Sequence, residues 1–368
     1  MVDSNPTTNN TIPALPNDER VAMLAQWLRT LPAEFGIQAE TLSVASADAS
    51  FRRYFRVCAT ASHSSFIVMD APPTHEDCAP FIHVAELFGS SGVNVPKILA
   101  QDLDQGFLLL TDLGNTTFLT ALNADLSQAD GLYRQALKAL VQLQKSSQPN
   151  VLPDYNRQRL LDEMMLFPQW YLGVHYQYTL TDEQTASLTK VFNSLLDNNI
   201  AQTSVWVHRD YHSRNLMLVD GAGDDVAINP GIVDFQDAVY GPITYDAVSL
   251  LRDAYIEWPE DQQIDWLARY WEMARAAGLA VPDTFDVFYR DFEFMGLQRH
   301  LKVLGIFARL YHRDGKSGYL KDLPLVLKYT RQVAARYREF GSLLRLLDDV
   351  AQKSDGAGAD TTHVGYTF

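Results

Sequence analysis

The stretch that most constrains how this chain can fold is VWVHRDYHSRNLML, residues 205–218. Asp210 follows an apolar run, and Asn215 comes five residues later at the start of another. A further run, GIVDF, carries Asp234 near its end. Short apolar runs bounded by polar residues predict brief strands, so all three polar side chains fall at the end of a strand, Asn215 at the one where its strand begins. We therefore predict that they belong to one site.

The three side chains suit phosphoryl transfer. The amide of Asn215 and the carboxylate of Asp234 are hard oxygen donors, of the kind that hold Mg²⁺ together with substrate phosphates. Phosphoryl transfer needs positioning and charge neutralisation more than covalent help. Asp210 can then accept a hydrogen bond from an acceptor hydroxyl and take its proton as general base.

The order of these motifs resembles the catalytic loop and metal-binding Asp of protein kinases, with DFQD at 234–237 in place of D-F-G. Together with HRDYHSRNLML and DAVYGPITYDAVSLLRD, it resembles the aminoglycoside phosphotransferase family of small-molecule kinases. The resemblance extends from about Glu19 to about Asp349. It implies a bilobal α+β fold of the protein-kinase type, and the use of ATP and Mg²⁺ to phosphorylate an alcohol.

Further segments narrow the resemblance to the bacterial anomeric sugar kinases of cell-wall recycling. These segments are DASFRRYFRV, IVMDAPP, GFLLLTDLG, DFQDAVYGPITYD and GLQRHLKVLGIFARL. The resemblance implies a small-molecule amino sugar as substrate, namely N-acetylmuramate or N-acetylglucosamine. The C1 hydroxyl would be phosphorylated, giving 1-phosphates for peptidoglycan recycling.

The predicted nucleotide-binding residues lie in the first third of the chain. The turn SADASF has no glycine to lie over phosphates, so backbone N–H groups and the hydroxyls of Ser46 and Ser50 would serve instead. The backbone of Thr111, Asp112 and Leu113 is the expected hinge that contacts adenine.

The strand SFIVMD ends in Met69 and Asp70, where the wider kinase pattern has a phosphate-binding Lys. Either a guanidinium of RRYFR replaces the Lys, or this lobe binds nucleotide differently. Arg52 and Arg56 share one face of the expected strand, with Arg53 on the other. We place Arg53 among the nucleotide-binding residues, and the usual Glu partner, Glu86, would have an altered partner or none.

The predicted acceptor site combines five residues. An acidic chain needs local cations to bind the lactyl carboxylate of N-acetylmuramate, and the expected helix QRHLKVLGIFAR supplies them. The five residues are Tyr211, His212, Asp237, Arg299 and His300. Asp237 could equally be a solvated turn residue, and His208 and Asp246 are expected to have structural roles.

The 368 residues divide into an N-terminal arm (1–18), a nucleotide-binding N-lobe (19–112), a catalytic and sugar-binding C-lobe (113–350) and a C-terminal tail (351–368). The N-lobe reads as short strands with one helix at CAPFIHVAELFGSSG. The C-lobe is mostly helical, with helices expected at 129–144, 157–171 and 182–197, and DGAGDD as a hairpin turn.

The formal net charge of −15 argues against nucleic acid or membrane partners. The N-terminus lacks the basic and apolar regions of a signal peptide, and Cys58 and Cys78 read as free thiols in a reducing compartment. We expect a cytoplasmic monomer.

Two alternatives remain open at this stage. One is a kinase of another small alcohol, of the aminoglycoside, choline or homoserine type, although a polycationic aminoglycoside should be met by acidic loops. The other is a non-catalytic nucleotide-binding protein, suggested by the absent Lys and glycines. The presence of Asp210, Asn215 and Asp234 together argues against the second.

Overall fold

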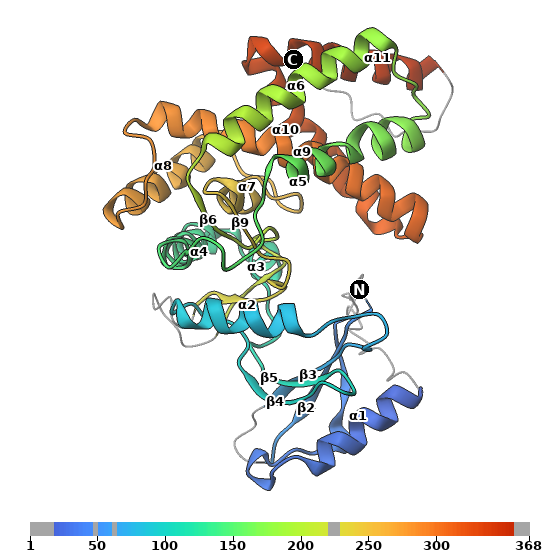
Figure 1. Cartoon of the computed structure of the whole chain (residues 1–368), viewed down its shortest axis with the longest axis vertical. Helices are drawn as coiled ribbons and strands as arrows, with labels where there is room; N and C mark the ends of the chain where they lie inside the picture. The colour runs from blue at the N-terminus through green and yellow to red at the C-terminus, as the bar shows by residue number, and fades with distance from the viewer. Residues whose placement is uncertain (1–17, 47–50, 61–64, 220–228, 357–368) are drawn as a thin grey trace, which may run out of the picture. The chain divides into compact units, whose positions relative to one another are not determined.

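The structure is a computed structural model that describes residues 18–46, 51–60, 65–219 and 229–356. It divides into two compact units (Figure 1). Unit 1 comprises residues 1–116 with 217–223 and 227–237, and unit 2 comprises the rest. The chain thus leaves unit 1 after Thr116, four residues beyond the end of the predicted N-lobe at residue 112, and returns to it for the segment that carries Asp234.

Unit 1 is built on a five-stranded antiparallel sheet in the order β1-β2-β3-β5-β4. Its strands are β1 (Ser43–Ser46), β2 (Arg53–Cys58), β3 (Ser65–Asp70), β4 (Ile98–Asp102) and β5 (Phe107–Thr111). Its helices are α1 (Glu19–Thr30) and α2 (Ala79–Ser90), with short 3₁₀ turns η1 (Ala33–Phe35) and η2 (Ala39–Thr41). Strand β8 (Gly231–Ile232) pairs with β7 (Leu216–Met217) in a separate two-stranded sheet.

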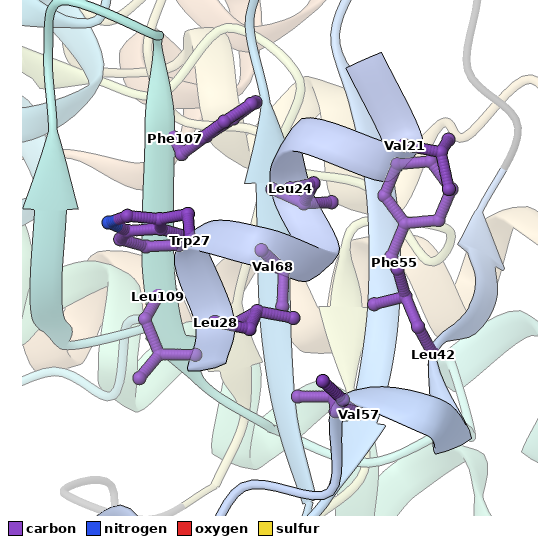
Figure 2. Packing of buried hydrophobic residues seen from close by; sticks show 11 residues of the cluster. Val21, Leu24, Trp27, Leu28, Leu42, Phe55, Val57, Val68, Phe107 and Leu109 are labelled. Atoms are coloured by element: carbon purple, nitrogen blue, oxygen red, sulfur yellow. The ribbon is translucent and has the colours of Figure 1, made fainter. Parts of the chain in front are cut away.

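Helix α1 covers one face of this sheet (Figure 2). Asp18 caps it by accepting a hydrogen bond from the backbone N of Val21 at 2.9 Å. The buried side chains Val21, Leu24, Trp27 and Leu28 recur at helical spacing. They pack on alternate residues of β2, β3 and β5: Phe55, Val57, Val68, Phe107 and Leu109.

Asp70 lies on the α1 face of β3 and is fully buried. It accepts hydrogen bonds from Nε of Arg20 at 2.8 Å and from Nε of Arg53 at 2.9 Å. Arg20 also donates to the carbonyl of Gln105 at 2.7 Å. Because a buried charge is costly without a partner, these two cations explain how an acid can end this strand.

Unit 2 is predominantly helical. Its helices are α3 (Phe118–Ala124), α4 (Ala129–Gln144), α5 (Arg157–Met164), α6 (Asp182–Ala201), α7 (Tyr245–Leu251), α8 (Glu260–Ala276), α9 (Phe285–Asp314), α10 (Leu323–Arg336) and α11 (Gly341–Gly356). Short turns are η3 (Leu126–Gln128), η5 (Ser317–Asp322) and η6 (Arg338–Phe340). Strands β6 (Ser204–Val207) and β9 (Val239–Pro242) form an antiparallel pair.

The predicted fold class is confirmed, and the predicted helices at 129–144 and 182–197 match α4 and α6. The helix predicted at 157–171 is wrong in its second half. It ends at Met164, and a π-helix, η4, spans Phe167–His175. Pro168 gives the reason, because it has no N–H to continue the α-helical hydrogen bonds.

At the other end of the chain, α11 continues to Gly356, into the segment predicted as a tail. The rest of that tail, the N-terminal arm up to residue 17 and the predicted DGAGDD turn lie outside the described residues. In the part of the chain that the structure describes, no helix has both the length and the apolar character needed to cross a membrane.

The long helix α9 is the central element of unit 2 and packs closely against η4. A Cβ added at Gly305 would lie 2.4 Å from the carbonyl carbon of Leu166, so only glycine permits this approach. The packing fixes the rotation of α9 about its axis, which decides which of its side chains face the neighbouring cavity described below.

We predict that Leu24→Ala lowers the unfolding free energy of unit 1 by about 2–5 kcal/mol, because it removes a fully buried side chain from the α1 interface. Urea denaturation followed by tryptophan fluorescence measures the change. Val287→Ala, at a position 52% exposed, is the control and should have little effect. Equal effects of the two substitutions would contradict the packing described for α1.

Candidate active site

The loop that carries Asp210 begins where β6 ends. Val205 and Val207 are buried and hold β6 in place, and the chain turns away at Arg209, whose φ is +77°. A non-glycine residue in this left-handed region is strained and persists only when its surroundings hold it. The backbone of the loop is therefore fixed by something other than local preference.

The group that holds this backbone is the carboxylate of Asp246, in the first turn of α7. Its Oδ2 accepts a hydrogen bond from the backbone N of His208 at 2.7 Å, and its Oδ1 accepts one from the backbone N of Arg209 at 3.0 Å. Asp246 is fully buried. Burial raises the pKa of Asp246 to about 7, although both hydrogen bonds act to lower it.

A second set of hydrogen bonds closes the loop on itself. The carbonyl of Asp210 accepts from the backbone N of His212 and from Nδ2 of Asn215, both at 3.0 Å. The backbone N of Asn215 donates to the carbonyl of His212 at 2.9 Å. Since Nδ2 is used in this way, the amide of Asn215 has a fixed rotation, which distinguishes its Oδ1 as the atom able to bind a cation.

Ser213, between these residues, is anchored from the far side of the loop. Its backbone N and its hydroxyl both donate to Oδ2 of Asp253, at 2.9 and 2.6 Å. Asp253 is fully buried, as is Ser213. Two buried acids, Asp246 and Asp253, thus brace the two halves of the loop from outside it.

Asp210 opens onto a cavity of about 250 Å³ within unit 2. Its lining combines charged and polar side chains with apolar side chains of α9. The lining residues are Asp210, His212, Tyr245, Ala254, Tyr255, Arg299, Lys302, Val303, Ile306, Phe307, Leu310 and Tyr319. A small polyhydroxylated molecule fits a cavity of this size and mixed character.

Two cationic side chains of α9 line this cavity, and they differ in their hydrogen-bond partners. Lys302 donates to the hydroxyl of Tyr245 at 2.9 Å and pairs with Glu163 at 3.1 Å. Arg299 is 4% exposed, and its Nε and Nη1 have no hydrogen-bond partner in the part of the chain that the structure describes. A buried guanidinium with unsatisfied donors is costly, so the cavity is arranged to receive an anionic or strongly accepting group.

The charge of Asp210 depends on these neighbours. Burial raises the pKa of Asp210, but Lys302, His212, Arg299 and Arg209 together lower it, and the net shift is below the ordinary value. Asp210 is therefore ionised at neutral pH. Burial lowers the pKa of His212, so its ring is neutral there and can accept or donate one hydrogen bond.

The second acidic motif belongs to unit 1, where it follows β8. Asp234 is exposed and has a φ of +64°, in the same left-handed region as Arg209. Its Oδ1 accepts a hydrogen bond from Nε2 of Gln236 at 2.8 Å. Asp237, three residues later, is also exposed. Phe235 between them is buried, and its ring contacts Phe81 of α2, which holds the motif in unit 1.

The predicted adenine-contacting segment lies at the end of β5. Thr111 exchanges two hydrogen bonds with Lys97, at 3.0 and 2.9 Å. Asp112 is held by Arg56 and Ser65. Burial raises the pKa of Asp112, but these hydrogen bonds outweigh it and the net pKa is lowered. Leu113 packs closely on Gly231, where an added Cβ would lie 2.9 Å from Cδ1 of Leu113.

The remaining predicted nucleotide-binding residues are Arg53, Ser46 and Ser50. Arg53 pairs with Asp70 and Asp18 on the α1 face of the sheet. Ser46 ends β1, and nothing is described of its side chain; Ser50 lies outside the described residues.

Three predicted acceptor residues are not among those that line the cavity: Asp237, which belongs to unit 1, and Tyr211 and His300, which are described here. Tyr211 is fully buried, and its hydroxyl donates to the carbonyl of Ala136 at 2.8 Å. His300 is buried too, with its ring stacked on Tyr329. Both residues therefore support the elements around the cavity, while their sequence neighbours face it.

Sequence reasoning missed the buried charge network beside Asp210. Glu163 of α5 accepts from the hydroxyl of Tyr155 and from Arg209, besides pairing with Lys302. Burial raises the pKa of Glu163, but Lys302 and Arg209 lower it below its ordinary value. The spacing of Lys302, one helical turn after Arg299, is the only sequence signal that pointed to it.

Among the described residues, no group of three or more His, Cys, Asp or Glu side chains is arranged to hold a metal ion. A site that relies on closed protein coordination, as zinc sites do, is thus not seen in that part of the chain. An amide oxygen and a carboxylate, as in Asn215 and Asp234, instead fit the sparse oxygen ligation that Mg²⁺ uses beside phosphates.

Comparison with known proteins identifies the class. The model of the phosphotransferase enzyme family matches residues 41–281. Solved structures show the same fold: an ADP-bound aminoglycoside phosphotransferase APH(2'')-Ib has a TM-score of 0.54 at 15% identity, over 86% of this chain and 99% of that one. An ethanolamine kinase of Plasmodium vivax has a TM-score of 0.59 at 9% identity, over 84% and 87%. The chain is a kinase of the phosphotransferase enzyme family.

Curated relatives narrow the family further. A protein of Neisseria meningitidis is 48% identical over 95% of this chain and 100% of its own length, and one of Pseudomonas aeruginosa is 46% identical over 89% and 92%. Both are named N-acetylmuramate/N-acetylglucosamine kinase. This chain belongs to their family, so the predicted resemblance is confirmed and neither alternative function is favoured.

We predict that stability depends on pH through Asp246. Its folded pKa of about 7 lies above the ordinary 3.8, so its contribution is complete below pH 3.8 and is lost as the pH rises through 7. Relative to Asp246→Asn, the wild type should therefore lose stability between pH 4 and pH 8. Denaturation midpoints of both proteins over this range measure the difference.

Asp265→Asn, at an exposed residue, is the control and should follow the wild type. Curves for the wild type and Asp246→Asn that stay parallel at every pH would show that Asp246 keeps its ordinary pKa.

Proposed function

We propose that this chain is an ATP- and Mg²⁺-dependent kinase that phosphorylates the anomeric C1 hydroxyl of N-acetylmuramate and N-acetylglucosamine. The relatives at 46–48% identity, which match over most of their own length and carry this name, support the proposal. The products are sugar 1-phosphates, which suit the reuse of cell-wall sugars in the cytoplasm.

One observation carries the choice of substrate: Asp210 lines the same cavity as Arg299, whose Nε and Nη1 have no hydrogen-bond partner among the described residues. The lactyl group of N-acetylmuramate ends in a carboxylate, which offers the charge and the two acceptors that a guanidinium binds best. An aminoglycoside would bring ammonium groups to a cavity that already contains Arg299 and Lys302. In a buried cavity, the repulsion between like charges opposes such binding.

Asp210 acts as aligner and general base in this proposal. Its ionised carboxylate accepts a hydrogen bond from the C1 hydroxyl, aims the oxygen at phosphorus and takes the proton as the bond to phosphorus forms. His212, which lines the same cavity, binds a sugar hydroxyl. Tyr211 and His300 act as positioning residues through their buried contacts. Asp237, a residue of unit 1, keeps its predicted role in binding the sugar.

Asn215 and Asp234 are the residues that would hold Mg²⁺. When bound, this ion neutralises charge on the transferred phosphoryl group. The hydrogen bond from Nδ2 of Asn215 to the Asp210 carbonyl links the amide to the residue that acts as base. The backbone of Thr111, Asp112 and Leu113 contacts adenine, and Ser46 and Ser50 contribute hydroxyls near the phosphates.

We predict that Asp210→Asn lowers kcat by about 10²–10⁴-fold, because the amide cannot take the hydroxyl proton. The thermal midpoint and the affinity for ATP should stay close to those of the wild type. A coupled assay of ADP release with each amino sugar measures the loss, and Asp265→Asn serves as the matched surface control. Turnover at the wild-type rate in Asp210→Asn would exclude this residue as base.

We predict that Arg299→Ala raises KM about tenfold or more for N-acetylmuramate and much less for N-acetylglucosamine, which has no lactyl carboxylate. The same ADP-release assay gives both constants. Arg290→Ala, on the exposed side of α9, is the control, since Arg290 pairs with Glu339 away from the cavity. Equal increases for the two sugars would remove the carboxylate from the proposal.

A further inference from the structure

The carboxylate of Asp210 shares its cavity with a buried lysine, yet the two side chains are not paired. Lys302 and Asp210 both line this cavity of about 250 Å³. In the part of the chain that the structure describes, none of the ion pairs includes Asp210. Opposite charges attract strongly where water is largely excluded. Another interaction must therefore keep the lysine away from the carboxylate.

Lys302 is held by two oxygen atoms, one from α7 and one from α5. Its Nζ donates to the hydroxyl of Tyr245 at 2.9 Å and pairs with Oε1 of Glu163 at 3.1 Å. Lys302 is buried, so these two acceptors compensate its charge in place of bulk water. Of the two, only Glu163 supplies a full negative charge.

Glu163 also binds the cation that precedes Asp210 in the chain. Arg209 donates from Nη2 to the same Oε1 of Glu163. The guanidinium of Arg209 lies over the ring of Tyr155, 5.6 Å from its centroid, and the hydroxyl of Tyr155 donates to Oε2 of Glu163. One carboxylate outside the cavity lining thus engages two cations that are neighbours of Asp210.

The position of Glu163 is fixed by the contacts of α5. Asn156 caps this helix by accepting a hydrogen bond from the backbone N of Arg159 at 3.0 Å. Nε2 of Gln298 donates to the carbonyl of Leu160 at 3.3 Å, which ties α5 to α9. The carboxylate on α5 and the lysine that it binds on α9 are therefore held together by their helices as well as by their charges.

Loss of this carboxylate would leave Lys302 with one neutral partner, the hydroxyl of Tyr245. A buried ammonium without a counter-charge is costly, and a lysine has a flexible four-carbon stem. Asp210 lines the same cavity and would offer the replacement carboxylate. A direct ion pair would occupy an oxygen that has to accept the sugar hydroxyl, and it would make the carboxylate a weaker base.

We propose that Glu163 is a positioning residue: by binding Lys302, it prevents an ion pair between Lys302 and Asp210 and keeps the base accessible to the acceptor hydroxyl. The inference rests on the role of Asp210 as base in the proposed function. Glu163 is not among the residues that line the cavity, so it acts through the lysine and not by touching the sugar.

The first test is a double-mutant cycle on kcat/KM, measured as ADP release with N-acetylglucosamine, which has no carboxylate to bind a lysine. Glu163→Gln should lower kcat/KM about tenfold or more, while the Kd for MgATP stays within about twofold, because only the acceptor side of the reaction is involved. In a Lys302→Met background the competing cation is absent, so the same substitution should cost less than about threefold. Glu272→Gln, at an exposed residue of α8, is the control and should keep the wild-type kcat/KM.

The second test observes the ion pair directly. A crystal structure of Glu163→Gln should show Nζ of Lys302 within about 4 Å of a carboxylate oxygen of Asp210. A purely structural role of Glu163 would loosen α5 without forming this pair. If Glu163→Gln does not fold, Lys302→Met and the double variant still decide the question, because neither contains a lysine without a counter-charge.

Three results would overturn the inference: wild-type kcat/KM in a folded Glu163→Gln, equal losses from this substitution with and without Lys302, or a Glu163→Gln structure in which Lys302 stays apart from Asp210. The wild-type assay separates this question from the proposed function. A wild-type chain that phosphorylates neither amino sugar contradicts the proposed function, whereas an active wild type with equal losses contradicts only the role of Glu163.

Discussion

The hydrogen bonds from the backbone of His208 and Arg209 to the carboxylate of Asp246 determine where the reactive groups of unit 2 can lie. At this point the chain leaves β6 through a left-handed residue, so these two N–H groups cannot pair along the strand. Left without acceptors in a buried place, they would cost about 1–3 kcal/mol each. The acid offsets that cost and fixes the direction in which Asp210 leaves the sheet. It also couples the loop to α7, on which Tyr245 lines the cavity.

The cationic side chains around Asp210 are opposite in sign to the net charge of the chain. The net charge is −15, yet the cavity contains Arg299 and Lys302 at buried positions. Lys302 is compensated by Glu163, and Arg299 has donors left over. Both cations lower the pKa of Asp210, and Arg299 also keeps donors that can bind an anionic group. In a chain of negative net charge, a local cationic cavity favours an anionic ligand over a cationic one.

The class of fold could be predicted from the sequence, since it follows from short-range patterns and a resemblance, whereas the joint role of Asp210, Asn215 and Asp234 stays a prediction. The sequence could not identify Glu163 or Asp253, whose partners lie far along the chain and leave no periodic signal. The strand alternation of RRYFR separated Arg53 from Arg52 and Arg56 correctly. The strand alone does not show which face of the sheet α1 covers, because two short turns and another strand separate α1 from β2 in the chain.

The sequence is limited in the same way on α9, where helical geometry decides which of two neighbouring residues faces the cavity. Successive residues differ by about 100° around the axis, so Arg299 and His300 cannot both face the cavity. Arg299, Lys302, Val303, Ile306 and Leu310 follow the spacing of one face, and all five line it. Along about 16 Å of helix this face changes from cationic near Asp210 to apolar. A sugar with a charged side group and an apolar ring face matches that gradient, and a rotation of α9 by one residue would destroy it. Gly305, by allowing the close approach of η4, is what prevents such a rotation.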